Sequence, residues 1–158
     1  MIAELVLAAL TGNGSQFLQM FSGVWTCGNA HYHERWEVVP HRGTDTQGAW
    51  MADVAYGDPQ HPDGFAYVYF VPGANQFRYD DFHIDGSQSH LTAPPPTNGA
   101  WEWTGTYYPD AAAPDPGPDI TWRLTPQGTI ARTFAQRVNG KAIVRGSDTC
   151  TKQPDTRI

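Results

Sequence analysis

The chain has little charge and few basic residues. Only 16% of its 158 residues are charged, and ten Lys and Arg residues stand against 16 Asp and Glu residues, which gives a net charge of −6. Since the basic residues are scattered, there is no positive stripe to neutralise phosphates, and we expect no nucleic-acid partner. No apolar run is long enough to cross a bilayer as a helix, so we expect no membrane span.

Motifs of covalent and nucleotide chemistry are also missing. The sequence has no Gly-x-Ser-x-Gly, Cys-x-x-Cys, P-loop or dinucleotide-binding glycine pattern. Residues 1–10 are apolar, but they include Glu4 and lack a basic start, so they make a poor secretory signal. Whether the N-terminal segment belongs to the mature protein stays open.

Aromatic residues, glycine and proline are abundant. Aromatic side chains make up 13% of the sequence, beside 16 glycines and 13 prolines, a composition typical of short strands joined by tight turns. We expect one all-β domain, a closed antiparallel β-barrel of about eight to ten strands. Its strands are predicted near residues 22–29, 31–40, 48–56, 65–71, 76–84, 87–92, 100–108, 119–125, 129–138 and 142–151.

The domain divides into three parts. Residues 1–21 have helical character and are expected to cap one end of the barrel, residues 22–152 form the barrel itself, and residues 153–158 form a tail. The last two strands are predicted to pair through Asn139-Gly140, a type I′ turn candidate because both residues tolerate positive φ.

Cys27 and Cys150 are the only cysteines, and they lie in similar contexts, Trp-Thr-Cys-Gly and Asp-Thr-Cys-Thr. A bond between them would tie the first strand to the last, where the ends of a closed barrel meet. Two free buried thiols are the alternative. A disulfide indicates an oxidising compartment, so we expect an extracytoplasmic location, periplasmic or secreted.

Gly23-Val24-Trp25, placed at the start of the first strand, resembles the Gly-x-Trp signature that opens lipocalin-like barrels. The resemblance implies that Trp25 plugs the closed end and that an arginine of a late strand stacks on it, Arg145 or else Arg137. With Cys27 and the closing Asp-Thr-Cys-Thr-Lys, the chain also looks like small bacterial exported barrel proteins of unassigned function.

Haem-binding barrels of the nitrobindin type use Gly-x-Trp-x-Gly-x-Gly. In this chain Cys27 and Asn29 replace the last two glycines of that pattern. Haem is therefore not expected, and no other cofactor is predicted.

Barrels of this size hold side chains and at most one small ligand. Our first hypothesis is that the interior binds a small, partly apolar or aromatic molecule, in a protein that is a monomer or a homodimer. The residues expected to line this cavity are Trp36, Trp50, Tyr67, Tyr69, Trp101, Trp103, Tyr107 and Arg132. Arg132 shares its strand face with Ile130 and Phe134, so either this charge points into the lumen with a partner or solvent interrupts the apolar face of the strand. A lumenal arginine would suggest an acidic ligand.

An enzyme that uses the same cavity is the second hypothesis. His31, His33 and Glu37 share a strand face, as in a 2-His-1-carboxylate metal site, although the same residues also suit a solvent face or a polar cavity wall. Asp81 and His83 share another face and suit cofactor-free acid/base chemistry. A third hypothesis is a structural or protein-binding module with no cavity.

Overall fold

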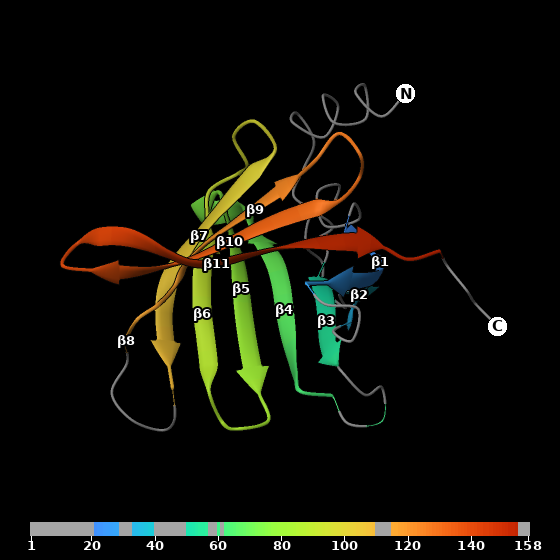
Figure 1. Cartoon of the computed structure of the whole chain (residues 1–158), viewed down its shortest axis with the longest axis horizontal. Helices are drawn as coiled ribbons and strands as arrows, with labels where there is room; N and C mark the ends of the chain where they lie inside the picture. Colours follow the sequence, from blue (N-terminus) through green and yellow to red (C-terminus); the bar gives the residue numbers. More distant parts are fainter. Residues whose placement is uncertain are drawn as a thin grey trace.

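The computed structural model describes residues 21–28, 33–39, 50–56, 60, 62–109 and 115–154. These residues form an all-β protein with antiparallel pairing (Figure 1). The strands are β1 (Gly23–Cys27), β2 (His33–Val39), β3 (Trp50–Tyr56), β4 (Gly64–Val71), β5 (Gln76–His83), β6 (Gln88–Ala93), β7 (Ala100–Tyr108), β8 (Asp115–Pro116), β9 (Asp119–Leu124), β10 (Ile130–Val138) and β11 (Lys141–Lys152), with a short 3₁₀ turn, η1 (Pro72–Ala74), between β4 and β5.

The strands form a single curled sheet in the order β6-β5-β4-β3-β2-β1-β11-β10-β9-β7-β8. β7 joins the two ends at staggered heights, because residues 104–108 pair with β6 whereas residues 100–103 pair with β9. The strands β9 to β11 cross the upper part of the sheet, and β4 to β7 continue below that crossing as a single layer (Figure 1). The expected barrel is thus confirmed as an all-β curled sheet, but as a half-barrel and not a fully closed barrel.

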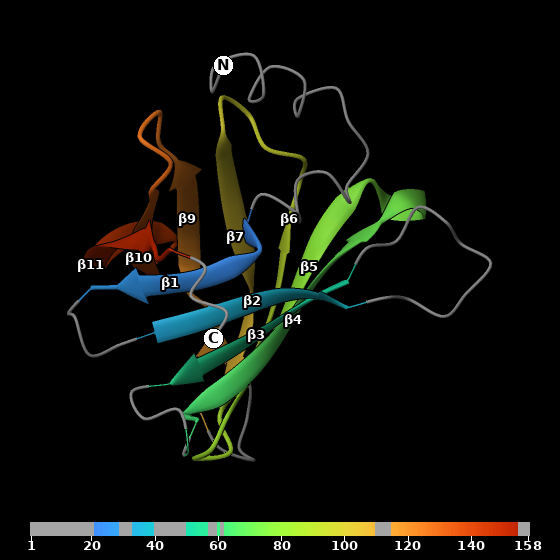
Figure 2. The same ribbon diagram turned by 90° about the vertical axis from the view of Figure 1, so that its right-hand side faces the viewer.

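The seam between the first and last strands is as expected. β1 pairs with β11, and Cys27 lies directly opposite Cys150 in that pairing. The two residues form a disulfide across a sequence separation of 123. β1 and β2 connect this seam to the β3–β5 side of the sheet, so the two chain halves lie side by side (Figure 2).

The predicted turn of the last hairpin is confirmed. Asn139 and Gly140 have φ values of 51° and 77°, the positive values that a type I′ turn requires. At Gly105 the strands approach so closely that a Cβ atom would lie 2.0 Å from the carbonyl oxygen of His90, so a side chain has no room there. The expected helical cap, residues 1–21, lies outside the described residues except for its last residue, Phe21.

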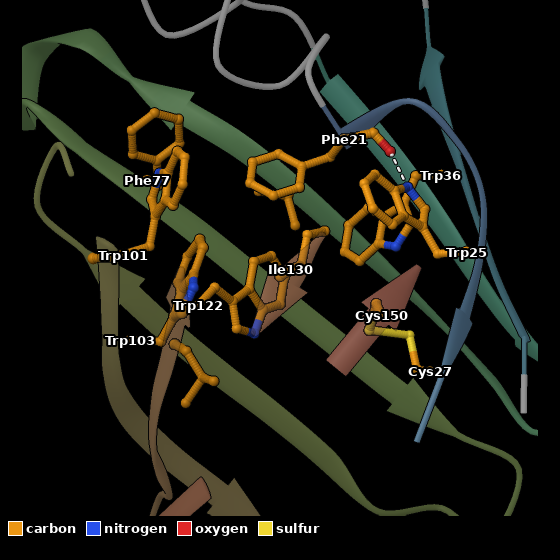
Figure 3. Close-up of a cluster of buried hydrophobic side chains, with 13 residues drawn as sticks. Phe21, Trp25, Cys27, Trp36, Phe77, Trp101, Trp103, Trp122, Ile130 and Cys150 are labelled. Carbon is orange, nitrogen blue, oxygen red and sulfur yellow. Dashed lines mark hydrogen bonds between the residues drawn. A yellow bond between two sulfur atoms is a disulfide. The ribbon is translucent and has the colours of Figure 1, made fainter. Parts of the chain in front are cut away.

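The core is mainly aromatic and lies on the inner face of the curled sheet. The labelled rings point toward one another from β1, β2, β5, β7 and β9 (Figure 3). Trp122 is at the centre, with its ring centroid 5.1 Å from that of Trp103 and 5.5 Å from that of Trp36. The buried cluster comprises Phe21, Trp25, Cys27, Trp36, Val68, Phe77, Leu91, Ala93, Trp101, Trp103, Trp122, Ile130 and Cys150.

Candidate functional sites on two faces of the sheet

Strand alternation gives the sheet two chemically different faces. On β4, Ala66 and Val68 are buried, whereas Phe65 and Tyr67 are 48% and 37% exposed. The side that holds the buried cluster is called the inner face here, and the opposite side the outer face. Each face carries its own group of polar and aromatic residues.

An ion-paired triad lies on the inner face. Arg132 on β10 donates from Nε and Nη2 to the two carboxylate oxygens of Asp148, at 2.8 and 2.6 Å. Its Nη1 donates to Glu34 Oε1 at 2.5 Å, and Trp36 Nε1 donates to the other oxygen of Glu34 at 3.2 Å. The triad therefore links β2 to β10 and β11 beside the disulfide.

The charge of Arg132 is compensated within the protein. Burial works against the charged guanidinium, but its hydrogen bonds to Asp148 and the attraction of Glu34 outweigh this effect and raise the pKa of Arg132. Of the two alternatives expected for Arg132, the structure shows the one with partners, which are Glu34 and Asp148. The sequence analysis missed Glu34 and Asp148; strand alternation alone could have placed Glu34 on the same face as Trp36.

Potential metal-ligating atoms come together next to the triad. Among the described residues, Cys27, Glu34 and Cys150 offer ligand atoms that lie within 4.8 Å of one another. Both sulfurs are bonded in the disulfide, so they do not provide the thiolates that bind metals. The short distances among these atoms therefore reflect the close packing of Glu34 against the disulfide and do not indicate a metal site.

Trp103 has a polar atom without a partner. Its side chain is 2% exposed, and its Nε1 has no hydrogen-bond acceptor among the described residues. The ring lies between aromatic neighbours, with centroids 5.1 Å from Trp122 and 5.7 Å from Tyr79. Buried indole N–H groups nearly always have a partner, which is protein, water or ligand.

An Asp–His pair lies on the same inner face, at the C-terminal end of β5. His83 Nε2 and Asp81 Oδ2 are 2.9 Å apart, and the side chains are 37% and 16% exposed. The hydrogen bond that His83 makes to Asp81 raises the pKa of His83 above its usual value, against the opposing effect of burial. In the register of the sheet, Asp81 lies opposite Ser89, and Ser89 lies opposite Tyr107.

A continuous row of rings crosses the outer face. Phe65 contacts Tyr67 and stacks on Phe82, with centroids 5.9 and 5.2 Å apart. Phe82 in turn contacts His90 at 6.0 Å, and His90 contacts Tyr108 at 5.7 Å. These five residues, called the aromatic strip, come from β4, β5, β6 and β7.

Asp80 organises the polar part of the outer face. Its Oδ1 is 2.7 Å from His90 Nδ1, and its Oδ2 accepts a hydrogen bond of 2.9 Å from the Tyr69 hydroxyl. Because an ionised carboxylate only accepts, Nδ1 of His90 carries the proton of this hydrogen bond, and Nε2 takes no part in it. Burial and the Asp80 interaction raise the pKa of Tyr69 and keep its hydroxyl protonated.

The predicted cavity residues divide between the two faces. Trp36, Trp101 and Trp103 are buried on the inner face, and Tyr107 shares its side of β7 with the last two. Tyr67 and Tyr69 alternate with the buried Ala66 and Val68 and so lie on the outer face, contrary to the expectation of one common lining. Arg132 is inward, as described above. Trp50 is on β3 opposite Tyr69, but its side chain lies outside the described residues.

The predicted metal ligands are described only in part. His33 Nδ1 lies 3.2 Å from Thr26 Oγ1. His31 and the side chain of Glu37 lie outside the described residues, so this metal site stays a prediction.

The expected arginine on Trp25 is replaced by a lysine. Lys152 Nζ lies 5.6 Å from the Trp25 ring centroid, while Trp25 Nε1 donates to the carbonyl oxygen of Phe21 at 2.7 Å (Figure 3). Arg145 lies on the exposed stretch of β11, and Arg137 pairs with Asp119 at 3.0 Å. Lysine reaches the ring because β1 and β11 are direct neighbours, with Trp25 opposite Lys152 in register.

The chain matches no model of a protein family, no curated protein and no solved structure. Within the described residues, no helix has the length and apolar character needed to span a membrane. The class that the fold defines is thus an all-β protein with a disulfide-linked, curled antiparallel sheet, and its sites must be argued from their own geometry.

Proposed function

We propose that the protein binds a small, partly apolar molecule on the inner face of the curled sheet, against Trp103. The observation that carries the proposal is the Trp103 indole N–H, which is buried without an acceptor among the described residues. A buried donor left unsatisfied costs about 1–3 kcal/mol. A ligand with a carbonyl or hydroxyl oxygen removes that cost, and an apolar body suits the surrounding rings.

The neighbours of Trp103 favour an aromatic or similarly flat ligand. Trp122 and Tyr79 present rings on two sides of the indole, and offset or edge-to-face contacts with a third ring add about 0.5–1.5 kcal/mol each. Asp81 and Ser89 lie on the same face of neighbouring strands. An enclosed interior of the lipocalin-like kind is part of this proposal, as is an extracytoplasmic location suited to the disulfide.

The experiment compares two probes that differ in one acceptor. Acetophenone carries a carbonyl oxygen on an aromatic ring, whereas ethylbenzene has the same ring without an acceptor. Titrations followed by the indole N–H signals in ¹H–¹⁵N NMR should show that the native protein prefers acetophenone, with the largest change at Trp103. The Trp103→Phe variant should lose that preference, while the Trp101→Phe variant keeps it.

Two results would contradict this proposal. One is equal binding of both probes, or of neither, to the native protein. The other is native mass spectrometry of protein from its own host that shows no co-purifying molecule, together with an indole signal of Trp103 that exchanges with water. In that case water is the hydrogen-bond acceptor of the Trp103 indole N–H.

Acid/base catalysis by Asp81 and His83 is the second candidate, and one observation favours it. The 2.9 Å pair lies on the inner face and near solvent, so a bound molecule on that face would meet a polarised imidazole. Asp81→Asn should abolish turnover of any substrate found for the inner face and leave the binding of acetophenone unchanged. Turnover that survives this substitution would remove the candidate.

A further inference from the structure

The aromatic strip on the outer face is contiguous and exposed. Phe65 is 48% exposed, Tyr67 is 37% exposed, and the His90 side chain is 43% exposed. The rings contact one another in sequence across four adjacent strands. Large apolar side chains that gather in this way on a protein surface mark an interaction site.

The residues around the strip indicate what kind of partner it takes. Protein interfaces are rich in aromatic residues, Met and Arg and poor in Asp and Glu, and membrane-binding faces are rich in Lys and Arg. The described outward positions of β4 to β7 that are at least partly exposed contain one Val and no Leu, Ile, Met or Lys, and their full charges are one Arg, one Asp and one Glu. They are Phe65, Tyr67, Tyr69, Val71, Gln76, Arg78, Asp80, Phe82, Gln88, His90, Thr92, Glu102, Thr104, Thr106 and Tyr108.

This combination of rings and hydroxyl-bonding groups is complementary to a sugar. A pyranose ring has a face of C–H groups, which the negative face of an aromatic ring attracts. Its edge carries hydroxyls, which can donate hydrogen bonds to Asp80 and can donate to or accept from His90 Nε2 beside the strip. Since the protein has a net charge of −6, a neutral sugar is favoured over an anionic one.

The extent of the strip favours a chain of sugars over a single one. Its rings lie on four neighbouring strands, and three strand spacings amount to about 14 Å. We propose that the outer face of β4 to β7 is a second binding site, which takes a neutral, extended β-linked polysaccharide on the aromatic strip. This proposal concerns the opposite face from Trp103 and does not depend on the ligand proposed there.

The test measures binding of cellohexaose and chitohexaose by titration calorimetry, and retention of the full chain on cellulose and chitin. We expect the native protein to bind at least one of the two oligosaccharides. Phe65→Ala and His90→Ala should each weaken that binding about tenfold or more, as expected for central contacts of a binding site. Phe65→Tyr, which keeps the ring, should retain it.

Matched controls separate this site from other exposed apolar residues. Ile84 is 81% exposed but lies in the hairpin after β5, so Ile84→Ala should bind sugar like the native protein, and so should Trp103→Phe. The proposal is overturned if neither oligosaccharide binds, or if Phe65→Ala binds as tightly as the native protein. Sedimentation that reveals a dimer dissociated by Phe65→Ala, without sugar binding, would instead assign the strip to a second copy of the chain.

Discussion

The two faces of the curled sheet use the same kind of residue for different purposes. On the inner face Phe77 is 1% exposed and belongs to the packed core, whereas on the outer face Phe65 is 48% exposed and stacks on Phe82. Burial of the inner rings stabilises the fold. The outer rings stay partly exposed, so they can still bury apolar surface against a partner. Aromatic content therefore indicates a site only after strand alternation has assigned each ring to a face.

The largest effect that we expect concerns the seam that holds the inner face together. Replacing both cysteines, as Cys27→Ala with Cys150→Ala, releases a loop with a sequence separation of 123. The loop-entropy model then predicts a loss of about 4–5 kcal/mol in the free energy of unfolding. Urea denaturation of the native and doubly substituted proteins measures it, and a loss below about 1 kcal/mol would mean that the seam contributes little.

A pair of phenylalanine substitutions compares the faces directly. Phe77→Ala removes a fully buried ring and should lower the free energy of unfolding by about 3–5 kcal/mol. Phe65→Ala removes a half-exposed ring on the neighbouring strand and should lower it by only about 0.5–1.5 kcal/mol, through the lost ring contacts. Urea denaturation of the two variants gives both values, and similar losses would contradict the assignment of the faces.

Arg132 tests whether the inner face tolerates an unpaired charge. Arg132→Met leaves the buried Glu34 beside the partly exposed Asp148 without their cation, which should cost up to about 3–5 kcal/mol. Adding Glu34→Gln and Asp148→Asn removes both negative charges, so the triple variant should recover part of the loss. Denaturation of the single and triple variants decides the point: a triple variant less stable than Arg132→Met would show that charge compensation is not the reason.

Features that depend on neighbouring residues could be predicted from the sequence, whereas features that depend on contacts between distant strands could not. The turn at Asn139-Gly140 and the inner positions of β7 were predictable because positive φ and strict alternation depend on neighbouring residues. The stretch 65–71 is apolar on both faces, so alternation gave no sign that Phe65 and Tyr67 face outward. The link from Arg132 to Glu34 spans 98 positions and depends on the curl of the sheet, which no local pattern carries.

For a similar reason, the sequence could not show that the sheet forms a half-barrel and not the expected closed barrel. Strand number and turns were readable, but the height at which β7 meets β6 and β9 depends on register. The close approach of β7 to β6 at Gly105 and the break between β8 and β9 lie near this change of partner. Both are contacts between strands, and they become visible only in three dimensions.

The smallest expected effect is a change in the titration of His83 at the lower end of the inner face. The hydrogen bond from His83 to Asp81 raises the pKa of His83, burial lowers it, and the nearby Asp85 and Asp63 add to the increase. Asp81→Asn removes the largest cause, so the pKa of His83 should fall toward its usual value of about 6.5 or below it. NMR titration of the imidazole signals measures this, with His83→Gln to assign them.

The same shift fixes the sign of a pH dependence of stability. A raised folded-state pKa means that the folded protein holds the His83 proton more tightly than the unfolded chain does. The stabilisation is thus fully present below the unfolded pKa of about 6.5 and is lost as the pH rises through the folded value. The stability difference between the native protein and Asp81→Asn should therefore be larger at low pH than at high pH within this range. A difference that grows as the pH rises would show that Asp81 does not act through protonated His83.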